Sequence, residues 1–235
     1  MNPMEIIATE PPSSEQVRER HERLLHRLRL VAEANGHDPE RLRIVAVTKA
    51  WPIDVARAAV EAGLTRLGES RLQEAEPKVA ALPDAEWHFI GRLQSNKARR
   101  AVRAFPVIHS VESIDLMERL DQIVADEGRR TNLMLQVNVS GEETKAGLPP
   151  GALAMVVPPA AARLIGLMTI APMRASPGEA RVVFGRLRDL RDELQERIGL
   201  ELPELSMGMS LDAEAAAAEG ATLVRIGTAL FGSRG

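Results

Sequence analysis

The chain has 235 residues, of which 45% are hydrophobic and 27% are charged, and its formal net charge is −3. This length suits one large domain with a sizeable core, and the charge balance gives no indication of a nucleic-acid or membrane surface. Cysteine is absent, which excludes disulfides, thiolate catalysis and cysteine metal sites, and tyrosine is absent as well.

Residues 1–12 are expected to be extended or disordered, and residues 13–235 are expected to form a single α/β domain. The first ten residues lack the basic start and the apolar core of a signal peptide. The most apolar region, residues 152–172, contains Arg163 and several prolines and cannot span a bilayer. The sequence therefore predicts a soluble, cytoplasmic protein without a membrane contact.

An amphipathic helix opens the predicted domain. Ser13 followed by Gln16 fits a capping box, and an apolar stripe continues to about Asn35, where Gly36 suits a C-terminal cap. His21 and His26 lie on this helix without a cage of carboxylates or cysteines, so no metal site is expected there.

Eight short β-like runs alternate with helical patterns along the rest of the chain. The strand candidates are residues 43–48, 66–68, 86–91, 107–110, 133–139, 164–170, 204–206 and 222–226. The helical patterns include residues 53–62, 113–126, 179–198 and 212–219. This alternation predicts a parallel sheet closed into a single (β/α)8 TIM-type barrel, with the N-terminal helix as an addition.

Lys49 directly follows the first predicted strand, and Pro52 then ends the extended run. Barrels of this kind carry their chemistry at the carboxyl ends of the strands. An amine that is desolvated there can become a nucleophile toward an aldehyde, because its pKa falls. The alternative interpretation is a surface lysine that flanks a strand.

The last predicted strand leads through Arg225 into Gly227 and Thr228 at the start of a short apolar turn. Backbone N–H groups, a hydroxyl and a helix dipole at such a point can bind a phosphate, and barrels often bind phosphate after strands seven and eight. The alternative is a strand-to-helix turn capped by a threonine. Closure of the barrel would place this turn beside Lys49, so the pair of features fits pyridoxal 5'-phosphate (PLP), with Arg225 facing the ring nitrogen.

Seven stretches of the sequence match the motifs of one known family. They are Ala46–Lys49, Gly68–Glu74, Trp87–Lys97, Val137–Gly147, Gly166–Pro172, Leu205–Ser210 and Val224–Gly232. Together they resemble the YggS/PROSC family of PLP homeostasis proteins, which are related to the barrel domain of bacterial alanine racemase. The resemblance covers residues 14 to 234 in order. It implies a barrel of the type III PLP fold.

The resemblance also implies roles for particular residues. Lys49 would hold PLP as an internal aldimine, a Schiff base, and Arg225 would meet the ring nitrogen. Ser206, Gly227 and Thr228 would hold the phosphate, and Ser210 is an additional candidate. The remaining candidate contacts of the cofactor are Ser70, His88 and Met168. Histidines on barrel strands are more often structural, and a methionine near a pocket more often packs.

Three departures from the family pattern stand out. Ser70 replaces a frequent asparagine, which puts a contact with the cofactor in doubt. Arg92 replaces a histidine and could bind an anion, although a solvated loop arginine is the plainer interpretation. The segment 148–163 is short and rich in proline, so the fifth helix is expected to be stunted.

The same features bear on whether the chain is an enzyme. A permanently charged Arg225 opposes protonation of the ring nitrogen and so weakens the ring as an electron sink. Alanine racemase uses a tyrosine from a second domain as one base, and this chain has no tyrosine. His88 and His109 remain as possible acids or bases.

We therefore expect a PLP-binding protein of intracellular PLP homeostasis, without established catalytic activity and without a metal. It would be a monomer that serves apo PLP-dependent enzymes. The alternatives are a minimal PLP-dependent amino-acid racemase or lyase, and a phosphate-binding barrel without pyridoxal.

Overall fold

The computed structural model describes residues 11–142 and 145–233. The expectation for residues 1–12 falls almost entirely outside the described residues. Eight strands form one closed barrel in the order β1 to β8, and all neighbouring pairs, including β8 with β1, are parallel. The strands are β1 (Arg43–Val47), β2 (Arg66–Glu69), β3 (Glu86–Phe89), β4 (Val107–Val111), β5 (Asn132–Gln136), β6 (Arg163–Met168), β7 (Glu204–Ser206) and β8 (Leu223–Ile226). The predicted barrel is confirmed.

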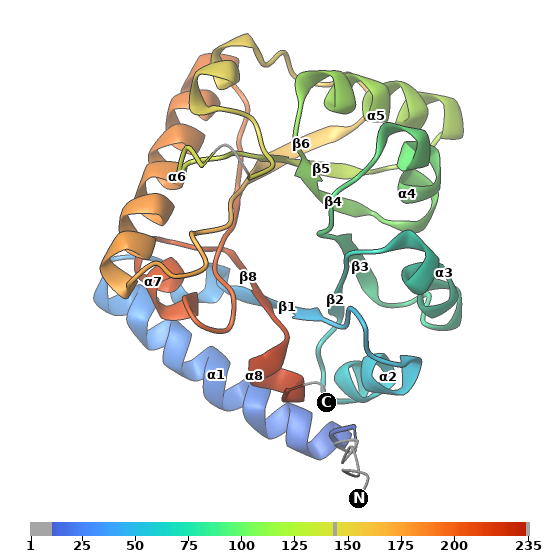
Figure 1. Cartoon of the computed structure of the whole chain (residues 1–235), viewed down its shortest axis with the longest axis vertical. Helices are drawn as coiled ribbons and strands as arrows, with labels where there is room; N and C mark the ends of the chain where they lie inside the picture. The colour runs from blue at the N-terminus through green and yellow to red at the C-terminus, as the bar shows by residue number, and fades with distance from the viewer. Residues whose placement is uncertain (1–10, 143–144, 234–235) are drawn as a thin grey trace, which may run out of the picture.

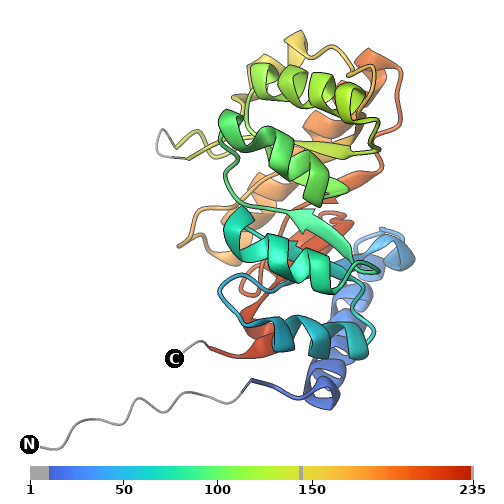
Figure 2. The same cartoon turned by 90° about the vertical axis from the view of Figure 1, so that its right-hand side faces the viewer.

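Helices surround the barrel, and Figure 2 shows α2 to α5 stacked in sequence order along one side. The α-helices are α1 (Ser14–Ala34), α2 (Ile53–Glu61), α3 (Leu72–Ala81), α4 (Ala98–Ala104), α5 (Ile114–Glu127), α6 (Pro177–Ile198), α7 (Ala213–Ala218) and α8 (Thr228–Phe231). Short 3-10 helices are η1 (Pro39–Arg41), η2 (Ser95–Lys97) and η3 (Pro150–Met155). None of the helices in the described part of the chain has the length and apolarity needed to cross a membrane.

The element boundaries differ from the sequence expectation mainly at the carboxyl ends of β3, β5 and β6, which are two or three residues shorter. At the end of β5, for example, Val137 forms an isolated bridge with Leu148 of its own loop. The apolar pattern of the sequence continues past these strand ends, where residues such as Val137 are buried although they lie outside the strands. The stunted fifth helix is confirmed, since η3 is the only helix between β5 and β6 in the residues that the structure describes.

Helix α1 is the predicted addition to the barrel. Ser13 and Gln16 form both hydrogen bonds of the capping box. The buried stripe of Val17, Leu24 and Leu28 packs α1 against α2, α7 and α8, which lie beside it in Figure 1. Arg20 also donates from Nη1 to the carbonyl oxygen of Leu230, at 2.9 Å. The addition therefore supports the last helix of the barrel.

The inside of the barrel has an apolar and a polar part. A small apolar cluster is separate from the larger core that joins strands to helices, and it consists of Val45, Val107, Met134, Ile165, Met168 and Leu223. The buried polar side chains include His88, His109, Ser206 and Arg225. Close packing between strands also requires Gly166, because a Cβ there would lie 1.9 Å from the carbonyl oxygen of Glu204.

Both buried histidines favour the neutral state. Burial lowers the pKa of His88, against an opposing effect of its hydrogen bond with Glu86. Burial also lowers the pKa of His109 well below its usual value, and repulsion from His88 and Arg225 adds to this shift. In the unfolded chain these histidines would take up a proton near their ordinary pKa of about 6.5.

We therefore predict that acid destabilises the fold between about pH 7 and pH 5. A histidine whose pKa is lowered by folding does not change the free energy of unfolding at pH values above its unfolded pKa. Below the unfolded pKa, the unfolded chain binds a proton that the folded chain does not bind, so the free energy of unfolding falls. The loss is up to about 1.4 kcal/mol per histidine and pH unit. Urea unfolding of the wild type and of His109→Gln across this range would measure it. The variant should show the shallower dependence on pH, whereas His26→Gln, on the exposed face of α1, should match the wild type. Equal slopes for His109→Gln and the wild type would contradict the prediction.

Candidate functional site

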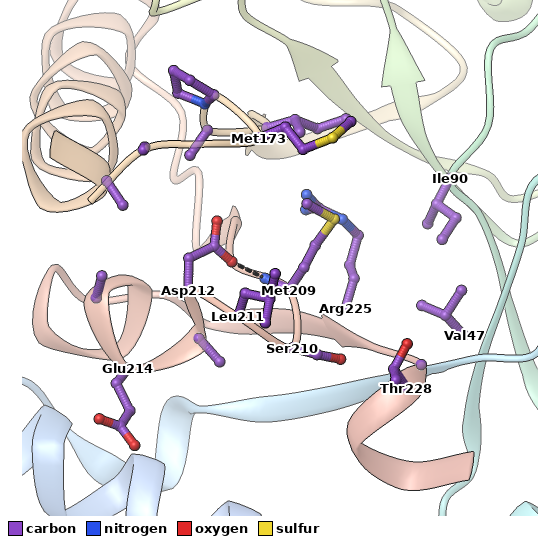
Figure 3. Close-up of a pocket in the computed structure, with 18 of the residues that line it drawn as sticks. Val47, Ile90, Met173, Met209, Ser210, Leu211, Asp212, Glu214, Arg225 and Thr228 are labelled. Carbon is purple, nitrogen blue, oxygen red and sulfur yellow. Dashed lines mark hydrogen bonds between the residues drawn. The ribbon is translucent and has the colours of Figure 1, made fainter. Parts of the chain in front are cut away.

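A cavity of about 600 Å³ opens at the carboxyl ends of the strands. Five of the residues predicted from the sequence line it, namely Lys49, Ser210, Arg225, Gly227 and Thr228. They come from the ends of β1 and β8, the loop after β7 and the start of α8. Residues of the loop after β6, including Pro172 and Met173, line the opposite side. Figure 3 shows Met173 across the cavity from Ser210 and Thr228.

Lys49 follows β1, and the backbone just before it is held by hydrogen bonds from buried side chains. The buried Lys78 of α3 donates from Nζ to the carbonyl oxygen of Thr48 at 2.9 Å and to Oε1 of Glu69 at 2.6 Å. The Thr48 hydroxyl donates to the same Glu69 oxygen at 2.9 Å. Lys78 and Glu69 have side-chain exposures of 7% and 0%, so this ion pair is shielded from water. The arrangement fixes the residue that precedes the lysine of the cavity.

The turn after Lys49 is strained and packs on the last helix. Ala50 has a φ of +59°, in the left-handed region that L residues with a side chain rarely adopt. Such strain persists where surrounding contacts enforce it, and it is common at functional sites. Trp51 packs edge-on against Phe231 of α8, with ring centroids 6.4 Å apart. The Lys49 turn and α8 are therefore in direct contact, as barrel closure predicts.

The start of α8 contributes polar groups to the same cavity. Gly227 and Thr228 line the cavity at the first positions of the helix, where backbone N–H groups have no acceptor in the preceding turn, whereas the Leu230 N–H already donates to the Gly227 carbonyl oxygen at 2.9 Å. The Ser210 hydroxyl accepts a hydrogen bond from the Ala229 N–H at 3.3 Å. In Figure 3 the side chain of Ser210 extends toward Thr228 at the cavity wall. Donors of this kind suit a phosphate.

Arg225 places a buried positive charge at the cavity. Its side chain donates to Ser206 Oγ from Nη1 at 2.6 Å and to the Thr169 carbonyl oxygen from Nη2 at 2.9 Å. Burial lowers the pKa of the guanidinium to about 10, and attraction to Asp212 opposes this shift. Arg225 forms no salt bridge with a carboxylate among the described residues. It remains protonated at neutral pH and can only donate hydrogen bonds.

The other predicted site residues do not line the cavity. Ser206 is fully buried behind Arg225, where its hydroxyl also contacts Nδ1 of His109 at 2.8 Å. His88 is buried lower in the barrel, and Met168 belongs to the apolar cluster of the interior. Ser70 is half-buried at the end of β2, where its carbonyl lies against Gly91. Direct contacts of these four residues with a cofactor remain predictions.

Some residues that support the site were not identified from the sequence. Glu69 and Lys78 are the clearest, and Lys78 could have been noticed as a charged residue on the buried stripe of α3 that includes Leu72 and Ala75. Arg92, the candidate for anion binding, instead pairs with Glu112 at 3.0 Å on the surface. Within the described ranges, no group of three or more histidine, aspartate or glutamate side chains is arranged to hold a metal ion.

The residues around the cavity fit PLP chemically. An amine suits the aldehyde, the hydroxyls and backbone donors of Ser210, Gly227 and Thr228 suit a phosphate, and Arg225 suits an unprotonated ring nitrogen. Because no carboxylate pairs with Arg225 in the described part of the chain, a buried cation is left for a ligand to contact. The cavity volume of about 600 Å³ lies within the range of small-molecule sites.

Comparison with known proteins agrees with this chemistry. Residues 21–235 match the family model of the alanine racemase N-terminal domain. The pyridoxal phosphate homeostasis protein of Pseudomonas aeruginosa is 45% identical over 88% of this chain and 91% of its own length. That of Synechocystis is 43% identical over 83% of this chain and 93% of its own length. Among solved structures, PipY of Synechococcus elongatus PCC7942 with PLP bound is 40% identical, with a TM-score of 0.78 over 92% of this chain and 100% of PipY.

These matches extend over nearly the whole barrel and include the cavity. The chain belongs to the family of pyridoxal phosphate homeostasis proteins, which share the alanine racemase N-terminal domain.

Proposed function

We propose that this protein binds PLP in the cavity, holds it covalently through Lys49 and acts in intracellular PLP homeostasis. One observation carries the proposal: Lys49, the donors at the start of α8 and Arg225 all line one cavity of the described barrel. In that part of the chain no carboxylate forms a salt bridge with Arg225. The homologues named pyridoxal phosphate homeostasis protein and the PLP-bound PipY structure support it. We further propose that the protein is a cytoplasmic monomer.

The residues around the cavity favour binding over catalysis. Bound PLP supplies an aldehyde and a ring that can accept electrons, most strongly when its nitrogen is protonated. Arg225 stays charged at neutral pH, and its positive charge opposes a proton on a neighbouring nitrogen. The ring would therefore form imines readily but stabilise carbanions poorly.

The positions of the two buried histidines also disfavour the racemase or lyase alternative. His88 does not line the cavity, and its two ring nitrogens contact His109 at 2.7 Å and Glu86 at 2.9 Å. His109 is fully buried. Neither histidine is therefore placed to exchange a proton with a substrate in the cavity. Asp212 accepts a hydrogen bond from the Met209 N–H at 2.6 Å, which ties it to its own loop.

The first prediction from the proposed function concerns Lys49. The purified protein incubated with PLP should show an absorbance band near the visible edge, and borohydride should fix the cofactor onto the peptide that contains Lys49. Lys49→Ala should lose the band completely, because no amine remains at this place. Lys97→Ala, which removes a lysine that does not line the cavity, should keep it. A band that survives in Lys49→Ala would refute covalent binding at this residue, and the absence of any band in the wild type would favour a phosphate-binding barrel without pyridoxal.

The second prediction concerns transfer of the cofactor. Ile170, Met173 and Leu211 line the cavity and expose 38%, 92% and 96% of their surface, so the mouth is open to a large partner. We expect the PLP-loaded protein to activate an apo PLP-dependent enzyme even when an excess of a protein that captures free PLP is present. Free PLP at the same concentration is the control and should fail under this condition. If the trap abolishes activation by the loaded protein as well, the protein buffers PLP and does not deliver it.

The third prediction concerns catalysis. Prolonged incubation of the PLP-loaded protein with single amino acids in deuterium oxide should give no α-proton exchange above that of Lys49→Ala. Mass spectrometry of the recovered amino acids measures the exchange. Reproducible, Lys49-dependent exchange at enzyme-like rates would establish the racemase or lyase alternative instead.

A further inference from the structure

A chain of hydrogen-bonded polar side chains crosses the inside of the barrel, from the partly exposed Glu86 at the end away from the cavity to the buried Arg225 at the cavity. Glu86 Oε1 contacts His88 Nε2 at 2.9 Å, and His88 Nδ1 contacts His109 Nε2 at 2.7 Å. His109 Nδ1 contacts Ser206 Oγ at 2.8 Å, which accepts from Arg225 Nη1 at 2.6 Å. Glu86 begins β3, at the end of the barrel away from the cavity, whereas Arg225 lines the cavity and is labelled in Figure 3.

The two ends of this chain determine the direction of every hydrogen bond in it. An ionised carboxylate only accepts, so Glu86 requires a hydrogen on Nε2 of His88. Nδ1 of the neutral His88 then accepts, which requires a hydrogen on Nε2 of His109. Nδ1 of His109 accepts in turn, and the Ser206 hydroxyl must donate to it. Arg225 only donates, so it occupies a lone pair of the same hydroxyl oxygen.

The reverse direction leaves groups without partners. If both histidines carried hydrogen on Nδ1, the lone pair of His88 Nε2 would face the Glu86 carboxylate. His109 and Arg225 would then both donate to Ser206 Oγ. The hydroxyl hydrogen of Ser206 would have no acceptor, because its contacts among the described residues are His109 and Arg225 alone. A buried donor without a partner costs about 1–3 kcal/mol.

The state of Glu86 itself is well supported. Its side chain is 43% exposed, and its second oxygen lies 3.7 Å from Nε of Arg66. Its hydrogen bond with His88 holds the pKa of the carboxyl below the usual value, against an opposing effect of burial. Glu86 therefore stays an acceptor at neutral pH.

We propose that Glu86 is a positioning residue for Arg225: through the tautomers of His88 and His109 it fixes the direction of the Ser206 hydroxyl, which holds the guanidinium at the cavity. Ser206 acts in this arrangement behind the arginine. The proposal concerns the protein's own hydrogen bonds and is testable without cofactor. Only its consequence for ligand affinity rests on the proposed function.

The experiment measures the histidine tautomers in the cofactor-free protein by nitrogen-15 NMR. We expect hydrogen on Nε2 of both His88 and His109 in the wild type. Glu86→Leu should produce Nδ1–H forms and faster exchange of the Arg225 guanidinium hydrogens with solvent. Glu86→Gln should retain the wild-type pattern, because its amide oxygen still accepts. Glu204→Leu is the matched control, because Glu204 also acts on the charge of His88 but, among the described residues, bonds to Arg43 and Thr222 and not to either histidine.

PLP affinity supplies the second measurement. Glu86→Leu should weaken binding roughly three- to tenfold, as expected for the loss of one well-oriented hydrogen bond, while Glu86→Gln and Glu204→Leu should stay within about twofold. Hydrogen on Nδ1 of either histidine in the wild type would overturn the proposal, and so would unchanged tautomers or unchanged affinity in Glu86→Leu. If Glu86→Leu does not fold, the proposal is tested by the histidine tautomers of the wild type and of Glu86→Gln. A wild type without PLP binding would refute the proposed function, while the tautomers would still test the chain.

Discussion

The parallel pairing of β1 with β8 is the constraint on which the site depends. Arg43 to Ala46 pair with Leu223 to Ile226, so the first and the last strand of the barrel end side by side. This contact joins residues 180 positions apart in sequence and places Lys49 on the same cavity as Gly227 and Thr228. A sheet that stayed open at this edge would leave the amine and the α8 donors on unrelated surfaces.

A second constraint is the burial of a positive charge. A guanidinium removed from water is costly unless other groups compensate for it. Arg225 receives two neutral acceptors from the protein, Ser206 and the carbonyl of Thr169. Further compensation of the guanidinium charge can come from a ligand in the cavity. In the proposed function, the same charge that would contact the ring nitrogen would also limit the chemistry that the ring can perform.

Much of the fold could be predicted because its signals are local. Apolar runs between polar residues marked the eight strands, and the Ser13 capping box marked the start of α1. Lys49, Arg225, Gly227 and Thr228 could be placed at the cavity because chemistry in a barrel gathers at the strand ends. Their contacts with a cofactor remain predictions.

The interior could not be predicted in the same way. The contact of His109 with Ser206 joins residues 97 positions apart, and it depends on the stagger between strands and on a register shift near His109 in β4. Neither quantity has a periodic signature in the sequence. The place of Ser206 between His109 and Arg225 therefore had no signal in the sequence, and a contact of Ser206 with a ligand stays a prediction. The Glu69–Lys78 pair was missed as well, although the position of Lys78 on the buried stripe of α3 could have indicated a buried partner.

The edge-on contact of Trp51 with Phe231 has an optical consequence. The chain has two tryptophans and no tyrosine, and Trp87 is buried at the lower end of the barrel with its indole N–H bonded to the carbonyl of Leu82. Trp51, by contrast, lines the cavity. Its fluorescence should therefore respond to occupancy of the cavity, whereas Trp87 does not line the cavity. The protein carries its own reporter of cavity occupancy, which needs no label and no change to the sequence.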